Sequence, residues 1–549
     1  MKVVIIGGVA GGATAAARIR RLDEDTEIII FERSGFVSYA NCALPYYIGD
    51  EITDKNNLLL ASPSYLYNRY RINVKVIHEV IDINSLDKKV IVKNLDDGSV
   101  FEETYDKLLL SPGAKPVNLP FLNKPLNNVF TLRTVEDTFK IKEHLNANKI
   151  KNVGIVGGGF IGIEMAENIH KLGIDVTIIQ KDSQLLSNID RDIISFVHNN
   201  IRRKNVGILL NKNVLDVLNV DKKVIVKLND SSLEFDMLIV CIGVTPDNSL
   251  AIKAGLELGD KGAISVDTHM QTSIKDIYAV GDAVLITHKV LNKKKVVSLA
   301  GPANKEARVA ADNICGINSE YKGTLATNVI KIFDMTFAST GISEKEAITN
   351  NFNYEKVFLS PFNHATYYPN AKQMSLKVIY EKETLKILGA QAVGYEGVEK
   401  RIDVIATLMF ADGDALMLKD LDLSYAPPYS SAKDPVNMAG FIIDNIETGL
   451  VKQFFYDDLE KLSMLKDVIL LDTRTQYEYE KGHASGFINI PLDDLREKLD
   501  LLDKNKKIYI MCQSGLRSYL AARILMNYGY DAYNFSGGYR LYSSIKLDI

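Results

Sequence analysis

KVVIIGGVAGGATAAA (Lys2–Ala17) and NVGIVGGGFIGIEMA (Asn152–Ala166) are the two stretches of sequence that decide the fold. Each is a short strand rich in β-branched residues, a glycine turn and a helical stretch, and each leads to a second strand, at Glu27–Glu32 and at Asp175–Gln180. In such a unit the backbone N–H groups of the turn can approach a pyrophosphate at the positive end of the helix. The sequence therefore predicts two dinucleotide-binding domains rather than a short-period repeat.

Length and composition limit what else the chain can be. At about 150 residues per domain, 549 residues predict three or four domains, and 46% hydrophobic with 24% charged residues is typical of a globular protein. A net charge of −4 favours neither a nucleic-acid nor a membrane partner. The chain has no apolar run near the ~20 residues that span a membrane. Four cysteines exclude a disulfide framework and suggest a reducing compartment, so we expect a cytoplasmic protein.

The two glycine turns differ in detail. The second matches G-x-G-x-x-G in full, whereas the first has Val9 where the middle glycine would stand. Glu32 ends the strand after the first turn, where a carboxylate can accept from an adenosine ribose hydroxyl. At the position after the second turn that corresponds to Glu32, the chain has Gln180 followed by Lys181, which weakly favours NADH as the cofactor and tolerates NADPH. Since hydride passes between a nicotinamide and a flavin, the pair of sites predicts FAD and NADH or NADPH.

Cys42, in SYANCALPYY, is the first candidate for a reactive cysteine. It stands at the start of a predicted helical turn, whose N-terminus would favour the thiolate. No second cysteine lies nearby in the sequence, so Cys42 would cycle as a single thiolate through a mixed disulfide, persulfide or sulfenic acid. Cys241 and Cys315 are interpreted as structural, because free cysteines are often buried.

Seven motifs make the first 445 residues similar to the single-cysteine flavin disulfide reductases: GGVAGG, SYANCALPYY, LLLSPGAKP, GGGFIGIEMAE, CIGVTPD, IYAVGDA and LAGPANKEAR. This family groups coenzyme A-disulfide reductase, NADH oxidase, NADH peroxidase and the persulfide reductases. The resemblance implies an α/β fold with two Rossmann-like domains, for FAD (1–115 and 250–322) and NAD(P) (116–249). An α+β dimerisation domain (323–445) and a linker (446–460) would follow.

The resemblance also implies the cofactor contacts. Those for FAD fall on Gly7, Gly8, Val9, Ala10, Gly11, Gly12, Glu32, Arg33, Ser111, Pro112, Gly113, Gly281 and Asp282. Those for NAD(P) fall on Gly157, Gly158, Gly159, Phe160, Ile161, Gly162, Glu164, Gln180, Lys181 and Gly243. No metal site is predicted.

One feature favours the coenzyme A-disulfide reductase branch. The oxidases and peroxidases typically carry a histidine in the first glycine turn, where this chain has Val9-Ala10. The other branch uses two tyrosines of the partner subunit, which correspond to Tyr367 and Tyr425 in a homodimer. Its coenzyme A contacts fall on Thr14, Arg18, Arg21, Ser38, Asn41, Asn304 and Lys433. A further basic contact of that branch falls on Tyr70, between Arg69 and Arg71.

MCQSGLRS, residues 511–518, is a second cysteine loop, between the strand IYIM and a helix. Loop amides converging on Cys512, with Arg517 adding positive charge, would stabilise a thiolate or a persulfide. With LLDTRTQYEYEKGHASGFINIPL upstream, the segment 461–549 resembles a rhodanese domain. The resemblance makes Cys512 the sulfurtransferase cysteine and Arg517 its anion-binding arginine, with Asp472, Arg474 and His483 as structural supports.

Together these features predict an FAD-dependent NAD(P)H oxidoreductase that reduces coenzyme A disulfide, coenzyme A persulfide or polysulfide. Cys42 would attack the substrate, and Cys512 would handle sulfane sulfur. Two alternatives remain open at this point: an NADH oxidase or peroxidase, and a sulfur carrier or redox sensor.

Overall fold

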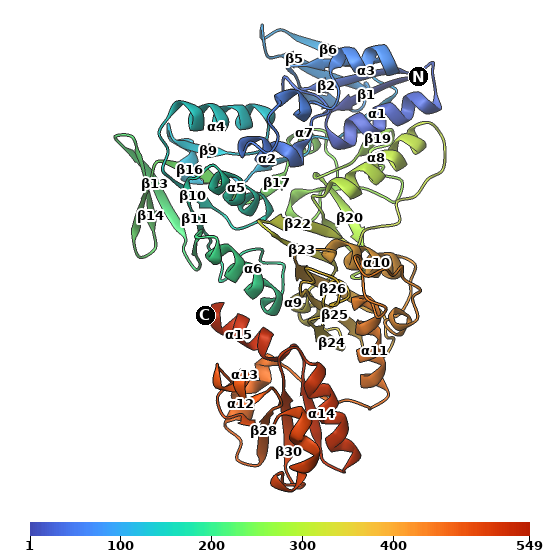
Figure 1. The fold of residues 1–549 in the computed structure, drawn as a ribbon. Coiled ribbons are helices and arrows are strands. Elements are labelled where there is room, and N and C mark those ends of the chain that lie inside the picture. Colours follow the sequence, from blue (N-terminus) through green and yellow to red (C-terminus); the bar gives the residue numbers. More distant parts are fainter. Residues whose placement is uncertain (549) are drawn as a thin grey trace. The chain divides into compact units, whose positions relative to one another are not determined.

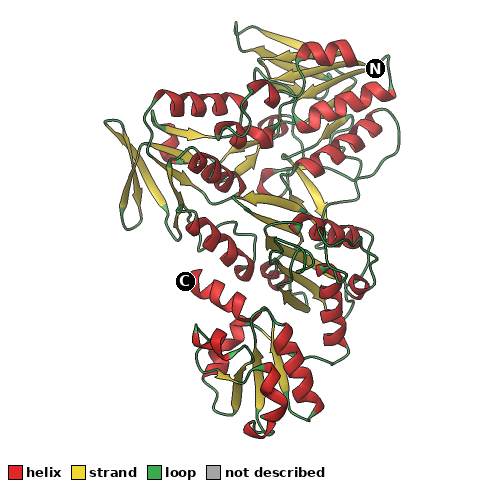
Figure 2. Ribbon diagram, in the orientation of Figure 1, coloured by secondary structure: helices red, strands yellow, loops and turns green. Residues whose placement is uncertain are grey.

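The computed structural model describes residues 1–548 and divides the chain into two compact units. The first unit comprises Met1–Leu185 and Val206–Ala326, and the second comprises Leu186–Asn205 and the chain from Thr327 onward. The segment 186–205 lies within the span predicted for NAD(P) binding, yet it packs with the second unit. Figure 1 labels the elements and Figure 2 separates helices from strands.

The first glycine turn belongs to a parallel five-stranded sheet. The strands run in the order β19-β7-β1-β2-β3. The first four are mostly apolar and buried, as expected for strands covered on both faces, whereas the edge strand β3 is only partly buried. Helix α1 (Ala10–Leu22) packs against α8 (Ala300–Ile314). The strands are β1 (Lys2–Ile6), β2 (Glu27–Glu32), β3 (Ile72–Val76), β7 (Lys107–Leu110) and β19 (Ile277–Ala279).

The second glycine turn belongs to another parallel sheet of the same unit, in the order β12-β11-β10-β16-β9. Helices α4 (Val135–Ala147) and α5 (Phe160–Lys171) accompany it. Its strands are β9 (Val129–Thr131), β10 (Asn152–Val156), β11 (Asp175–Ile179), β12 (Gly207–Leu209) and β16 (Met237–Val240).

Small sheets and short helices complete the first unit. The antiparallel three-stranded sheets are β4 (His78–Asn84), β5 (Lys89–Asn94) and β6 (Val100–Thr104), and β13 (Val214–Val220), β14 (Lys223–Leu228) and β15 (Ser232–Phe235). The others are the pair β8 (Ala114–Pro116) with β17 (Val244–Pro246), and the sheet of β18 (Ile264–Ser265), β20 (Val284–His288) and β21 (Lys293–Val296). The short helices are α2 (Leu44–Ile48), α3 (Pro63–Tyr70) and α7 (Ser249–Lys253).

The second unit begins with an antiparallel sheet in the order β22-β23-β26-β25-β24. Lys377, on β25 and only 1% exposed, forms ion pairs with Asp190, Asp192 and Glu344. These pairs tie the segment 186–205 to the sheet. The elements are α6 (Arg191–Arg203), β22 (Asn328–Ile332), β23 (Met335–Gly341), α9 (Glu344–Thr349), β24 (Tyr354–Leu359), β25 (Ser375–Glu381), β26 (Ile387–Gly394), α10 (Val398–Phe410) and α11 (Pro435–Glu447).

The end of the chain forms a parallel sheet in the order β27-β31-β30-β28-β29. Its edge strand β27 (Gln453–Phe454) falls within the stretch predicted as a linker. The other elements are α12 (Leu459–Ser463), β28 (Val468–Asp472), α13 (Gln476–Glu480), β29 (Ile488–Asn489), β30 (Lys507–Met511), α14 (Leu516–Asn527), β31 (Ala532–Phe535) and α15 (Gly538–Asp548). These sheets confirm the predicted fold class.

Helix α15 packs against α6 in the second unit. Ser544 and Ser195 share a hydrogen bond of 2.9 Å between hydroxyls, and Asp548 pairs with His198 at 2.9 Å. Among residues 1–548, no helix combines the length and the apolar character needed to cross a bilayer.

Candidate functional site

The first glycine turn is held by the carboxylate of Glu32. One oxygen accepts from the Gly8 N–H at 2.8 Å and the other from the Ser34 N–H at 2.9 Å. Burial raises the pKa of Glu32. A Cβ on Gly12 would lie 1.9 Å from the Gly7 carbonyl oxygen, so the helix starts directly against the turn. The predicted acidic residue therefore shapes the turn as well as standing where a ribose would bind.

Two other predicted cofactor loops meet this turn. Gly7, Ser111 and Gly281 each lie just beyond the carboxyl end of β1, β7 or β19, which are neighbours in the sheet. Parallel strands place their carboxyl ends at one edge, and the crevice there is where such folds bind ligands. The loops of Gly7–Gly12, Ser111–Gly113 and Gly281–Asp282 thus form one surface that fits a dinucleotide.

Partners that the motifs did not identify hold the loop after β19. The Gly281 N–H donates to Glu306 at 2.7 Å, and Asp282 pairs with Arg133 at 2.8 Å. Burial raises the pKa of Glu306 to about 7. Sequence reasoning assigned no role to Glu306, although it lies in the quoted motif LAGPANKEAR, and it gave no signal for Arg133. Arg33, predicted to contact FAD, pairs with Asp247 at 2.9 Å.

The second turn repeats this arrangement with an amide. Gly158 donates its N–H to Gln180 Oε1 at 2.8 Å, as Gly8 does to Glu32. A Cβ on Gly162 would lie 2.0 Å from the Gly157 carbonyl oxygen. Phe160 and Ile161 open α5, and Gly243 follows the neighbouring strand β16. This geometry fits a second dinucleotide.

Cys42 lies in a short 3-10 turn, Asn41–Ala43, followed by the five-residue helix α2. Its residue surface is exposed, yet partial desolvation of the thiol raises its pKa, and the nearby Glu164 and Asp282 add to that rise. The expectation that a helix N-terminus favours the thiolate is wrong for this chain. The turn is too short to supply a large dipole, and the nearest carboxylates oppose a negative sulfur.

Glu164 lies near Cys42 and has a raised pKa. Burial, reinforced by Glu167, raises its pKa to about 7, and a hydrogen bond with Tyr46 opposes that rise. Its charge therefore changes near neutral pH. The sequence placed Glu164 only among the cofactor contacts.

Some of the predicted coenzyme A contacts in the first unit form one group. Thr14 Oγ1 donates to Asn304 at 2.7 Å, and Arg18 pairs with Asp312 at 2.8 Å, all between α1 and α8. Arg18, predicted to contact coenzyme A, therefore already has a carboxylate partner. Of the other predicted contacts, Ser38 and Asn41 precede Cys42 in the chain, and Tyr70 ends α3 with its ring against Tyr65.

The two predicted tyrosines lie together in the second unit. The hydroxyl groups of Tyr367 and Tyr425 are hydrogen-bonded to each other, although 58 residues separate them. Tyr367 is 74% exposed, and its bond to Tyr425 raises its pKa. Lys433, the remaining predicted contact, is exposed, and its carbonyl accepts from the Ser431 hydroxyl.

Cys512 lies between β30 and α14 and is only 1% exposed. Its sulfur accepts from the Gly515 N–H and from the Ser518 hydroxyl, each at 3.2 Å. The loop backbone is bound to the start of α15, since Tyr539 N–H donates to the Cys512 carbonyl at 2.7 Å. A thiolate or persulfide would thus find donors already in place.

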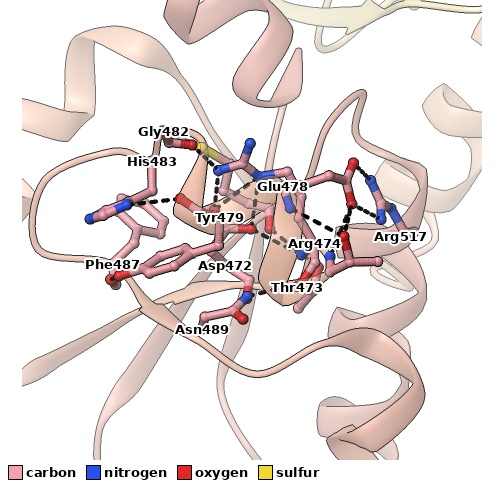
Figure 3. A network of polar contacts seen from close by, with 12 residues as sticks. Asp472, Thr473, Arg474, Glu478, Tyr479, Gly482, His483, Phe487, Asn489 and Arg517 are labelled. Carbon is pink, nitrogen blue, oxygen red and sulfur yellow. Dashed lines mark hydrogen bonds and ion pairs between the residues drawn. The ribbon is translucent and has the colours of Figure 1, made fainter.

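The Arg517 guanidinium is paired with a carboxylate. Both of its terminal nitrogens donate to Glu478, each at 2.7 Å. Figure 3 shows this pair beside the network of the upstream motif. The sequence quoted Glu478 within the upstream motif but gave it no role.

The upstream motif forms a buried framework (Figure 3). Arg474 pairs with Asp472 at 2.7 Å and donates to the Gly482 carbonyl at 2.8 Å. His483 stacks on Tyr479 with ring centroids 3.9 Å apart. These contacts agree with the expected structural roles of Asp472, Arg474 and His483.

Comparisons with known proteins agree with this geometry. The model of the pyridine nucleotide-disulphide oxidoreductases matches residues 1–307, that of their dimerisation domain residues 327–435, and that of the rhodanese-like domain residues 455–544. A coenzyme A disulfide reductase of Staphylococcus epidermidis is 37% identical over 441 residues, which is 80% of this chain and 99% of that protein. Its Staphylococcus aureus counterpart is also 37% identical, again over 80% of this chain and 99% of that protein.

Two solved structures match almost the whole chain. Reduced CoADR-RHD from Bacillus anthracis has 43% identity and a TM-score of 0.97, covering 100% of this chain and 98% of that one. A NAD-dependent persulfide reductase from A. fulgidus has 35% identity and a TM-score of 0.92, covering 99% and 100%. A water-forming NADH oxidase from Lactobacillus brevis shares the fold at 24% identity and a TM-score of 0.78, covering 82% and 99%.

The dinucleotide surfaces, the family models and the relatives agree. The chain carries the dimerisation domain through which this family forms dimers, and the family uses FAD and NAD(P)H. The chain is a member of the pyridine nucleotide-disulphide oxidoreductase family and carries a rhodanese-like domain at its C-terminal end.

Proposed function

We propose that this enzyme reduces coenzyme A persulfide, coenzyme A disulfide or polysulfide at Cys42, and that Cys512 binds and passes on sulfane sulfur. The observation that carries the proposal is the prearranged pair of donors on the Cys512 sulfur, in the same chain as two dinucleotide surfaces. A loop that stabilises a persulfide can bind the sulfane sulfur that a reductase in the same chain consumes.

In the proposed reaction, the Cys42 thiolate attacks the sulfur of coenzyme A persulfide that is bonded to carbon. A mixed disulfide forms between Cys42 and coenzyme A, the original sulfur–sulfur bond breaks, and hydrosulfide leaves. FAD and NAD(P)H, when bound, supply the two electrons that cleave the mixed disulfide into two thiolates. Coenzyme A disulfide would react in the same way, with a coenzyme A thiolate as the leaving group.

We assign three tasks to residues around the attack. Tyr367 of the partner subunit and Tyr425 of the partner subunit would stabilise or protonate the leaving sulfur, a role supported by the hydrogen bond between these two hydroxyls. Thr14, Arg18, Arg21 and Lys433 would contact coenzyme A. Glu164, with a pKa of about 7 near Cys42, would change its charge over the working pH range.

A steady-state screen of NADH oxidation tests the proposal. The purified holoenzyme is supplied with coenzyme A persulfide, coenzyme A disulfide, polysulfide, oxygen or hydrogen peroxide, and the screen is repeated with Cys512→Ser. We expect the sulfur substrates to be consumed far faster than oxygen or peroxide. Oxygen or peroxide turnover at a comparable rate would contradict the proposal and favour an oxidase or peroxidase, although Val9-Ala10 replaces the histidine of those enzymes. Persulfide transfer to a protein without NADH would favour a carrier.

A further inference from the structure

The ion pair between Glu478 and Arg517 stands at the start of α14, next to the Cys512 loop. Arg517 is the second residue of α14, five positions after Cys512, and the charge of Cys512 is one cause of the raised pKa of Arg517. The side chains of Arg517 and Glu478 are 32% and 30% exposed. A bidentate pair of this kind occupies the face of the guanidinium that would otherwise grip an anion.

Glu478 is held in place by its own helix. Of the two Glu478 oxygens that accept from Arg517, Oε2 also accepts from the Thr475 N–H and from the Thr475 hydroxyl, each at 2.9 Å, in the capping box that opens α13. The pKa of Glu478 is lowered to about 2, first by its bond from Arg517, so the carboxylate stays ionised at neutral pH. An arriving anion would have to displace an anchored carboxylate, not a mobile one.

The charge of Arg474, the other arginine of this network, is also neutralised. Arg474 is buried against the carboxylate of Asp472, which leaves that pair neutral. The backbone N–H of Arg540 donates to the Gln513 carbonyl, and the Arg540 guanidinium lies over the ring of Phe196. The groups that reach the Cys512 sulfur are a backbone amide and a hydroxyl, both uncharged.

We propose that Glu478 is a positioning residue that determines specificity: by pairing with Arg517, it keeps this arginine from binding sulfane donors that carry two negative charges. The site would then accept sulfane sulfur at the end of an uncharged chain, such as the pantetheine arm of coenzyme A persulfide, and discriminate against thiosulfate. Like charges brought together lower affinity for the wrong ligand, and specificity commonly rests on such a repulsive element. This inference rests on the proposed sulfur-handling role of Cys512.

The chemistry is the same for both donors. With thiosulfate, the Cys512 thiolate attacks the outer sulfur, the sulfur–sulfur bond breaks, a persulfide forms on Cys512 and sulfite leaves with its electron pair. Added cyanide then takes the outer sulfur as thiocyanate and returns the thiolate. Only the charge beside the transferred sulfur differs between thiosulfate and a persulfide on an uncharged chain.

The test compares Glu478→Gln with the wild-type holoenzyme in thiocyanate formation, using thiosulfate and the persulfide of N-acetylcysteamine as donors. Gln keeps an acceptor for Thr475 but removes the charge. We expect kcat/KM for thiosulfate to rise at least about 10-fold, with that for the N-acetylcysteamine persulfide nearly unchanged. Glu480→Gln is the matched control, since Glu480 lies on the same helix and bonds Gln476 instead.

Further results decide the outcome. The double variant Glu478→Gln/Arg517→Gln should lose the gain, because Arg517 is the group released. An equal rise for both donors, no rise for thiosulfate, or a wild-type enzyme that uses thiosulfate as well as the persulfide would overturn the role of Glu478. If Cys512→Ser leaves transfer from both donors intact, the proposed function of Cys512 fails instead.

Discussion

Cys512 and Cys42 differ in the groups that surround each sulfur within its own unit. The second unit buries Cys512 and gives its sulfur two donors at 3.2 Å, whereas Cys42 lies at an exposed short turn where partial desolvation and then nearby carboxylates raise the pKa of its thiol. One sulfur is therefore poised by its own loop to hold a negative charge. The other depends on groups beyond its own loop, which is consistent with a cysteine that exchanges electrons with a cofactor.

The largest expected effect is on the reduction of coenzyme A disulfide, which should require Cys42 but not Cys512. Cys42→Ser should lower NADH-dependent reduction of coenzyme A disulfide by about 1,000-fold or more, because the attacking sulfur is lost. Cys512→Ser should leave that reaction near wild type. Stopped-flow absorbance should show the flavin of Cys42→Ser still reduced by NADH. Cys315→Ser is the matched control, and surviving turnover in Cys42→Ser would refute the role of Cys42.

A smaller effect concerns the hydroxyl pair. Tyr425→Phe should lower kcat for coenzyme A disulfide by about 10-fold or more, since a donor to the leaving sulfur is removed. Its effect on flavin reduction by NADH should be slight. Tyr429→Phe, an exposed tyrosine of the same loop, is the control. Equal losses in both variants would point to the loop rather than to the hydroxyl.

The third effect is a pH dependence around Cys42. Glu164 loses its proton near pH 7, and the charge it gains opposes the Cys42 thiolate. Alkylation of Cys42 should therefore rise less than tenfold per pH unit near pH 7. In Glu164→Gln it should be about threefold faster at pH 8. Mass spectrometry of the Cys42 peptide of the reduced holoenzyme measures both, with the exposed Glu143→Gln as control. Identical pH profiles would remove Glu164 from this role.

The last effect concerns the donors of the second loop. Ser518→Ala removes one of the two hydrogen bonds to the Cys512 sulfur, worth about 1 kcal/mol, so sulfur transfer should slow about fivefold. Ser543→Ala, on α15, should leave the rate unchanged. A normal rate in Ser518→Ala would mean that the Gly515 amide suffices.

Much of the fold could be predicted because its signals are local. Each glycine turn sits in a strand–turn–helix unit, and close approach inside the turn, as between Gly12 and Gly7, excludes any other residue. The same holds for the Cys512 loop, whose donors Gly515 and Ser518 lie within six residues of the sulfur. The segment 186–205 could not be assigned from the sequence, because its partner Lys377 is distant in the chain.

The sequence by itself determined the two dinucleotide turns, the two candidate cysteines and the class of enzyme, since short-range patterns of strand, glycine and helix carry that information. Only the tertiary structure decided which charges face one another. Glu306 at Gly281, Arg133 at Asp282, the pair Tyr367–Tyr425 and the pair Glu478–Arg517 join residues that are 25 or more positions apart. Such pairs follow from packing, so spacing along the chain cannot reveal that Arg517 is already bound.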